Sequence, residues 1–115
     1  MTLDEIITEL GLVRLTDVSL DDQEKPEYGY TSDLLSCVMT GASKGSLWVT
    51  LQCHINIVAV ATLLDLAAVI ITEGALPDET TINKANQEGV VLLSTSKRSF
   101  EIVGRLWELG LRSAD

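Results

Sequence analysis

The residues best suited to chemistry in this sequence follow three short apolar runs, each of which ends in a hydroxyl residue. The runs span residues 47–50, 69–72 and 91–94, and their last residues are Thr50, Thr72 and Ser94. The intervals between these three positions are equal, which indicates one structural unit repeated along the chain. If the runs are parallel strands, their polar ends meet at one edge of a sheet, where ligands bind in such folds.

Further polar residues follow each run and complete a candidate ligand-binding set. Hydroxyl and amide side chains can hydrogen-bond a polar ligand, and nearby helix N-termini favour anions. The predicted ligand-binding residues are Thr50, Gln52, His54, Asn56, Thr72, Glu73, Gly74, Ser94 and Thr95. Lys97 and Arg98 are the only adjacent cations, so a nucleotide phosphate is one candidate ligand. The alternative is that the hydroxyl residues only cap the following helices and the two cations are solvated.

Cys53 and His54 are adjacent and raise the alternative of a small Cys/His enzyme. Adjacent residues on a strand-to-helix turn rarely point the same way, and no carboxylate has a recognisable spacing to them. Neither a phosphate-loop sequence nor paired metal-ligand spacing occurs. We therefore expect no catalytic residues, no metal and no cofactor, and we expect Cys37 to lie in the core.

The elements that must position these residues alternate along the chain. Helix-compatible segments follow the three runs at about 54–66, 77–88 and 97–109. Continuous apolar runs that alternate with helices are typical of a parallel sheet covered on both faces. The fold class predicted is therefore α/β, a small mostly parallel sheet with helices on both faces, in a single domain over residues 1–115.

The first part of the chain adds two helices and one strand to this prediction. Thr2 and Glu5 form a capping-box sequence for a short helix that ends at Gly11. Residues 12–15 are expected to form a strand, and residues 16–27 an exposed acidic connection. Any of residues 31–33 can cap a second helix, which ends near Gly41.

Composition restricts the partners of the protein. The chain has 115 residues and a net charge of −9, which repels phosphate backbones and anionic lipid surfaces. We therefore expect neither nucleic acid nor a membrane as partner. The first residues lack the pattern of a secretory signal, so we expect a cytoplasmic protein with reduced cysteines.

The helix expected at 54–66 has almost no polar face. In a domain of this size, such a helix often needs a second subunit to cover it, so we expect a homodimer.

Six stretches of the sequence resemble the DRTGG domain, a small module found alone and beside CBS pairs. They are GYTSDLLS at 29–36, LWVTLQ at 47–52, HINIVAVA at 54–61, AVIIT at 68–72, PD at 77–78 and FEIVG at 100–104. Many members have Thr-Gly-Gly after the central strand, where this chain has Thr72, Glu73 and Gly74. The resemblance implies a fold like the N-terminal domain of HPr kinase/phosphorylase, a dimeric state and a regulatory role. It also suggests a redox enzyme or a signalling kinase as protein partner.

Together these observations predict a non-catalytic regulatory domain that binds a small polar or nucleotide-like ligand, a partner protein, or both. The alternative is a protein-interaction adaptor without a small-molecule site, which would act through the helix around Val58 or the acidic segment 16–27.

Overall fold

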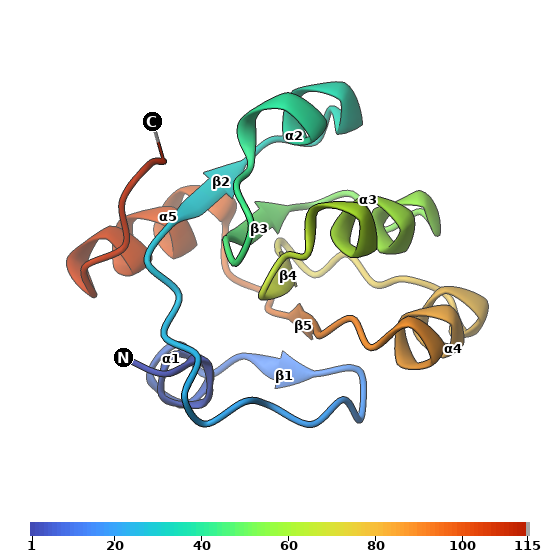
Figure 1. The fold of residues 1–115 in the computed structure, drawn as a ribbon, viewed down its shortest axis with the longest axis horizontal. Helices are drawn as coiled ribbons and strands as arrows, with labels where there is room; N and C mark the ends of the chain where they lie inside the picture. Colours follow the sequence, from blue (N-terminus) through green and yellow to red (C-terminus); the bar gives the residue numbers. More distant parts are fainter. Residues whose placement is uncertain (115) are drawn as a thin grey trace.

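The computed structural model describes residues 1–114 as five helices and five strands around one sheet (Figure 1). In chain order these are α1 (Leu3–Leu10), β1 (Val13–Arg14), β2 (Gly29–Thr31), α2 (Leu35–Gly41), β3 (Leu47–Thr50), α3 (Asn56–Leu64), β4 (Ala68–Ile71), α4 (Glu79–Glu88), β5 (Leu92–Ser94) and α5 (Ser99–Glu108).

The sheet has the order β1-β5-β4-β3-β2. Strands β2, β3, β4 and β5 run parallel to one another, and β1 pairs antiparallel with β5 at one edge. The predicted α/β class with a mostly parallel sheet is thus confirmed. Strand β2 is absent from the prediction, because residues 29–31 form no apolar run and directly precede the candidate helix caps.

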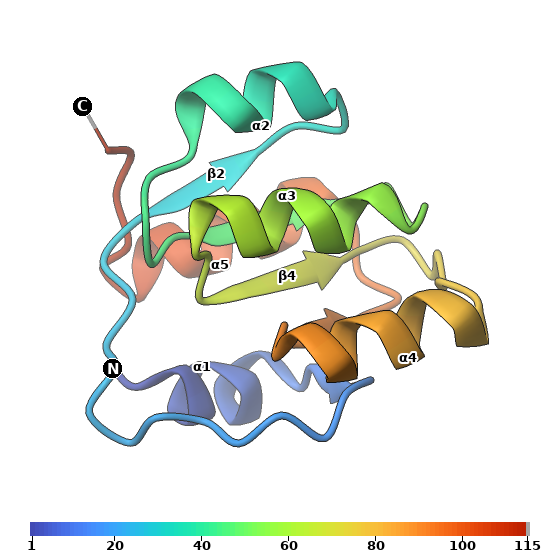
Figure 2. The same cartoon turned by 45° about the vertical axis from the view of Figure 1, so that its right-hand side comes forward.

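Helices cover both faces of the sheet (Figure 2). Leu47 and Val49 of β3 face a core that includes residues of α1 and α5, while Trp48 faces a second core that includes residues of α2, α3 and α4. This alternation follows from the two-residue period of a strand. All residues of β3, β4 and β5 are buried, which explains why these strands are apolar throughout.

The first helix forms as its sequence predicts. The Thr2 hydroxyl accepts the Glu5 amide and the Glu5 carboxylate accepts the Thr2 amide, at 3.2 and 2.9 Å. The helix ends at Gly11, whose φ of 63° is left-handed and therefore suits glycine.

The second helix differs from its prediction. Its N-cap residue is Leu34, which makes no side-chain capping bond, and the Asp33 carboxylate turns toward β3 instead. Val38 is the buried residue of this helix, and Cys37 is exposed. The expectation that Cys37 lies in the core is therefore wrong. The helix packs on the end of the sheet through a narrower stripe than its apolar residues suggest.

The connection predicted as exposed at 16–27 is anchored at its first residue. Thr16 is buried, donates its hydroxyl to the Val90 carbonyl and accepts the Leu92 amide, both at 3.1 Å. The hydroxyl thereby extends the pairing of the edge strand with β5. Pro26 is also buried, so only the residues between these two points are largely exposed.

The apolar helix α3 is buried along one side only. Ile57, Val58, Val60 and Ala61 are buried, whereas Leu63 is 68% exposed. Within the described chain, the other side of this largely apolar helix is therefore left uncovered.

Candidate functional site

The three hydroxyl-ended strands end side by side, as predicted. Thr50 and Ser94 both pair with Ile71 in the central strand β4. The Thr72 amide donates to the Thr50 carbonyl at 2.9 Å, and the Thr95 amide donates to the Ile71 carbonyl at 3.0 Å. We call this edge, with the loops 51–55, 72–78 and 95–98 that leave it, the strand-end edge.

The threonine hydroxyls at this edge are hydrogen-bonded within the protein. Thr50, Thr72, Ser94 and Thr95 are buried. The Thr72 hydroxyl lies 3.3 Å from the Thr50 carbonyl, to which it donates, and 2.5 Å from the Ser99 hydroxyl. Thr95 accepts the Lys97 amide at 3.1 Å. These hydrogen bonds fix the loops that leave the sheet. The buried threonines therefore support the strand-end edge from inside the protein.

Asp33, which follows β2, fixes the start of the loop after β3. Its Oδ1 accepts the Thr50 hydroxyl at 2.7 Å and the Leu51 amide at 2.9 Å. A carboxylate that accepts two donors is a strong constraint on a loop. Sequence reasoning missed this role because it treated Asp33 as a helix cap, and no spacing within the sequence relates residue 33 to residue 50.

The polar side chains of the next residues hold one another in a chain. Thr50 Oγ1 accepts the Gln52 amide at 3.0 Å, and Gln52 Oε1 accepts the His54 amide at 3.4 Å. His54 Nδ1 accepts the Asn56 amide at 3.1 Å, so its Nε2 stays available to a ligand. His54 and Asn56 are exposed and Gln52 is half-buried. The loop therefore presents preorganised polar groups to solvent.

The turn after β4 is left-handed at two successive residues. Glu73 has φ 61° and Gly74 has φ 76°. Their amides donate to the Lys97 and Thr95 carbonyls at 2.8 and 3.1 Å, and Glu73 Oε2 accepts the Ser99 amide at 3.3 Å. These two amides are therefore already used inside the protein and do not form a nest for an anion. Glu73 supplies the N-terminal bond that α5 lacks at its own N-cap residue.

Charges of both signs surround this edge. The Asp78 carboxylate caps α4 by accepting the Thr81 amide at 2.8 Å, which lowers the pKa of Asp78, and His54 adds a smaller lowering. Lys97 Nζ donates to the Leu10 carbonyl at 3.3 Å, while Arg98 is exposed. Arg98 is thus the cationic group open to a ligand here, and His54 offers the Nε2–H of its imidazole as a hydrogen-bond donor.

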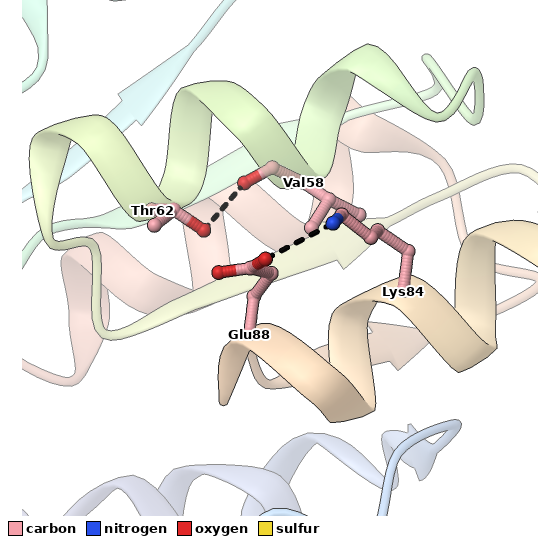
Figure 3. Close-up of polar contacts among 4 residues, drawn as sticks. All are labelled: Val58, Thr62, Lys84 and Glu88. Atoms are coloured by element: carbon pink, nitrogen blue, oxygen red, sulfur yellow. Dashed lines mark hydrogen bonds and ion pairs between the residues drawn. The ribbon is translucent and has the colours of Figure 1, made fainter.

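Two hollows lie away from most of the predicted residues. One, of about 260 Å³, is lined by Tyr30, Val103, Leu106 and Trp107 among others. The other, of about 390 Å³, lies between α3 and α4, and Asn56 is the predicted residue that lines it. Figure 3 shows its polar wall, where Lys84 and Glu88 form an ion pair at 3.1 Å.

Cys53 and His54, which are adjacent in the chain, differ in their surroundings, and His54 is exposed. Cys53 is half-buried and packs against the core that includes Trp48. Within residues 1–114, no group of three or more His, Cys, Asp and Glu side chains is placed to hold a metal ion. Over the same residues, no helix is both long and apolar enough to span a membrane.

The fold is similar to that of a solved regulatory structure. No family model matches this sequence, and the search of curated proteins gave no match. A crystal structure of the CBS and DRTGG domains of the regulatory region of Clostridium perfringens pyrophosphatase superposes with a TM-score of 0.68 over 99% of this chain, at 17% sequence identity. The chain has a DRTGG-like fold. It spans about half of that structure (51%), which holds the activator diadenosine tetraphosphate.

The DRTGG-like fold accounts for the arrangement of the strand-end edge. It brings the ends of β3, β4 and β5 together, and it adds β2 with Asp33 beside them. All nine predicted residues lie at this edge or in the loops and helix start that leave it. Their role as ligand contacts remains a prediction.

Proposed function

We propose that this chain is a non-catalytic regulatory domain, homodimeric, that binds a small polar or nucleotide-like ligand at the strand-end edge. The observation that carries the proposal is the fold it shares with about half of a regulatory region that was crystallised in complex with the activator diadenosine tetraphosphate. The exposed polar groups of the edge support it, because they are preorganised and not needed for the core.

The predicted residues divide into two groups under this proposal. Gln52, His54, Asn56, Glu73 and Gly74 are accessible and would contact the ligand. The buried hydroxyls of Thr50, Thr72, Ser94 and Thr95 would hold the loops in place, as their burial suggests.

A phosphate-containing ligand is favoured near Arg98, which supplies an exposed positive charge, and near His54, whose Nε2–H can donate to a phosphate oxygen. The chain as a whole carries −9, so an anion approaching elsewhere meets net repulsion. Exposed Glu73 disfavours a second phosphate beside the central turn. The phosphates would therefore lie toward Arg98 and the His54 ring, with the remainder of the ligand on the side-chain amides of Gln52 and Asn56.

Ligand occupancy would be passed to a protein partner. A redox enzyme or a signalling kinase in the cytoplasm remains the partner class that we propose. A second function, an adaptor without a small-molecule site, is favoured by the exposed apolar side chains Leu63 and Phe100, which are 68% and 92% exposed.

A thermal-unfolding screen tests the proposal. The panel is diadenosine tetraphosphate, ATP, AMP and inorganic tripolyphosphate. A ligand at one hundred times its Kd should stabilise the fold by about 2.7 kcal/mol. The shift should disappear in His54→Ala and persist in Leu63→Ser, which lies outside the proposed site. No shift with any compound would favour the adaptor.

A further inference from the structure

Helix α5 presents a largely exposed apolar stripe, of which Trp107 is partly covered by the Arg112 guanidinium. Phe100 is 92% exposed and Trp107 is 54% exposed, and Gly104 lies between them. Their spacing of four and three residues places them on one face of the helix. The helix lies at the side of the molecule, beyond β2 and β3 (Figure 1).

No contact or backbone angle within one chain requires a glycine at position 104. A glycine inside a helix costs roughly 1 kcal/mol relative to alanine. Its φ is not left-handed, and a Cβ built at Gly104 meets no atom within 4 Å. Close approach of a second helix explains a glycine in the middle of an exposed apolar stripe, because the missing side chain lets two backbones come together.

The charges beside this stripe indicate which partner would cover it. Arg98, Glu101, Arg105 and Glu108 alternate in sign along α5, and the last three share one flank at helical spacing. Within residues 1–114 the ion pairs are Lys44 with Asp65 and Lys84 with Glu88, so the four charges of α5 are in none of them.

A second copy of α5 that runs antiparallel would place charges of opposite sign against this alternating pattern. When two such helices cross at Gly104, Glu101 comes within one turn of Arg105 in the second copy, and Arg98 within one turn of Glu108. A two-fold axis generates each contact twice. The same crossing puts Phe100 beside Trp107 of the second copy, at the hollow lined by Val103 and Leu106.

The net charge of the chain also favours α5 over the rest of the surface as a contact between two copies. Two chains of −9 repel each other, whereas the four charges of α5 sum to zero, and exposed Arg112 lies 4.2 Å from the Trp107 ring centroid. Repulsion between copies is therefore weak at this face.

We infer that α5 is the homodimer interface, paired antiparallel with α5 of a second copy across Gly104. The inference rests on the homodimer of the proposed function and names its surface.

Charge-reversal variants test the pairing through contacts that exist only between copies. Glu101→Arg and Arg105→Glu should each weaken the dimer about tenfold, measured by analytical ultracentrifugation of the full chain. An equimolar mixture of the two variants should regain dimers, because opposite charges face each other again when each copy carries a different one of the two changes. Phe100→Ser should weaken the dimer roughly thirtyfold, and the control Leu63→Ser should leave it unchanged.

Circular dichroism of each variant verifies folding, and the exposed positions make unfolding an unexpected result. A dimer that survives all three α5 changes but is lost in Leu63→Ser would overturn the α5 interface and keep the homodimer. A wild-type chain that stays monomeric at high micromolar concentration would overturn both. Failure of the mixture to regain dimers, with each single variant monomeric, would overturn the antiparallel arrangement.

Discussion

The Asp33 carboxylate accepts the Thr50 hydroxyl at 2.7 Å and so joins the end of β2 to the end of β3. The same oxygen accepts the Leu51 amide, and Thr50 itself is buried. One side chain that follows the edge strand β2 thereby sets the direction in which the loop 51–55 leaves the sheet. The loop carries Gln52 and His54, so the geometry of the proposed site depends on this contact.

Replacing Thr50 by valine keeps the shape of the side chain and removes this bond. The free energy of unfolding, measured by urea titration, should fall by about 1–2 kcal/mol, because the Asp33 carboxylate loses the buried Thr50 hydroxyl that donates to it. Thr62→Val is the matched control, since its hydroxyl donates only to the Val58 carbonyl within α3 at 2.8 Å and the residue is exposed (Figure 3). A loss in Thr50→Val no larger than in Thr62→Val would contradict the role given to Asp33.

The Glu73 turn offers a test that separates backbone strain from side-chain bonding. Glu73→Ala removes the acceptor of the Ser99 amide and keeps a side chain at φ 61°, so it should destabilise the fold. Glu73→Gly loses the same bond but suits the left-handed turn, and it should be more stable than the alanine variant by roughly 1 kcal/mol. Thermal unfolding of the two variants measures this difference. Equal stability would contradict the claim that a side chain at position 73 strains the left-handed turn.

Asp78 should make the fold sensitive to acid. Its bond from the Thr81 amide holds the pKa of the carboxyl below the ordinary value of 3.8. A depressed folded pKa means that the contribution is present above 3.8 and is lost as the pH falls through the folded pKa. The variant Asp78→Asn keeps a side chain that can cap the helix but does not titrate.

The measurement is unfolding of both proteins between pH 6 and pH 2. The advantage of wild type over Asp78→Asn should shrink below about pH 4. If the difference in stability between wild type and Asp78→Asn stays the same from pH 6 to pH 2, the charge of the Asp78 carboxylate does not stabilise the helix cap.

The two cysteines should label in the order of their exposure. Cys37 is exposed and Cys53 is half-buried, so iodoacetamide should modify Cys37 first, as read by mass spectrometry of tryptic peptides. Cys37→Ser leaves only Cys53 to react, and its labelling should then be slow. Faster labelling of Cys53 than of Cys37 would support the Cys/His enzyme instead.

The parallel core could be predicted from the sequence because each of its strands is apolar on both faces. β3, β4 and β5 are buried throughout, and the runs 47–50, 69–72 and 91–94 place them within about one residue. Strand β2 could not be predicted from the sequence, because Gly29–Thr31 is half-exposed at the edge of the sheet and has no continuous apolar run.

The common edge at which the candidate residues lie could be predicted, but the hydrogen bonds among them could not. The common edge of Thr50, Thr72 and Ser94 follows from parallel strands of equal spacing. The contacts of Asp33 with Thr50 and of Glu73 with Ser99 join residues far apart in the chain, so local patterns carry no signal for them. Exposure of Cys37 depends on how far α2 sits over the sheet, which is likewise a tertiary property.

The central claim is that the strand-end edge binds a nucleotide-like ligand, and amide chemical-shift mapping tests it most directly. Diadenosine tetraphosphate is titrated into the ¹⁵N-labelled chain, with residues in the hollow beside Trp107 as internal reference. We predict saturable shifts at residues 51–56, 73–74 and 95–98 that vanish in His54→Ala. Shifts confined to the neighbourhood of Trp107, or none with any nucleotide in the panel, would contradict the account.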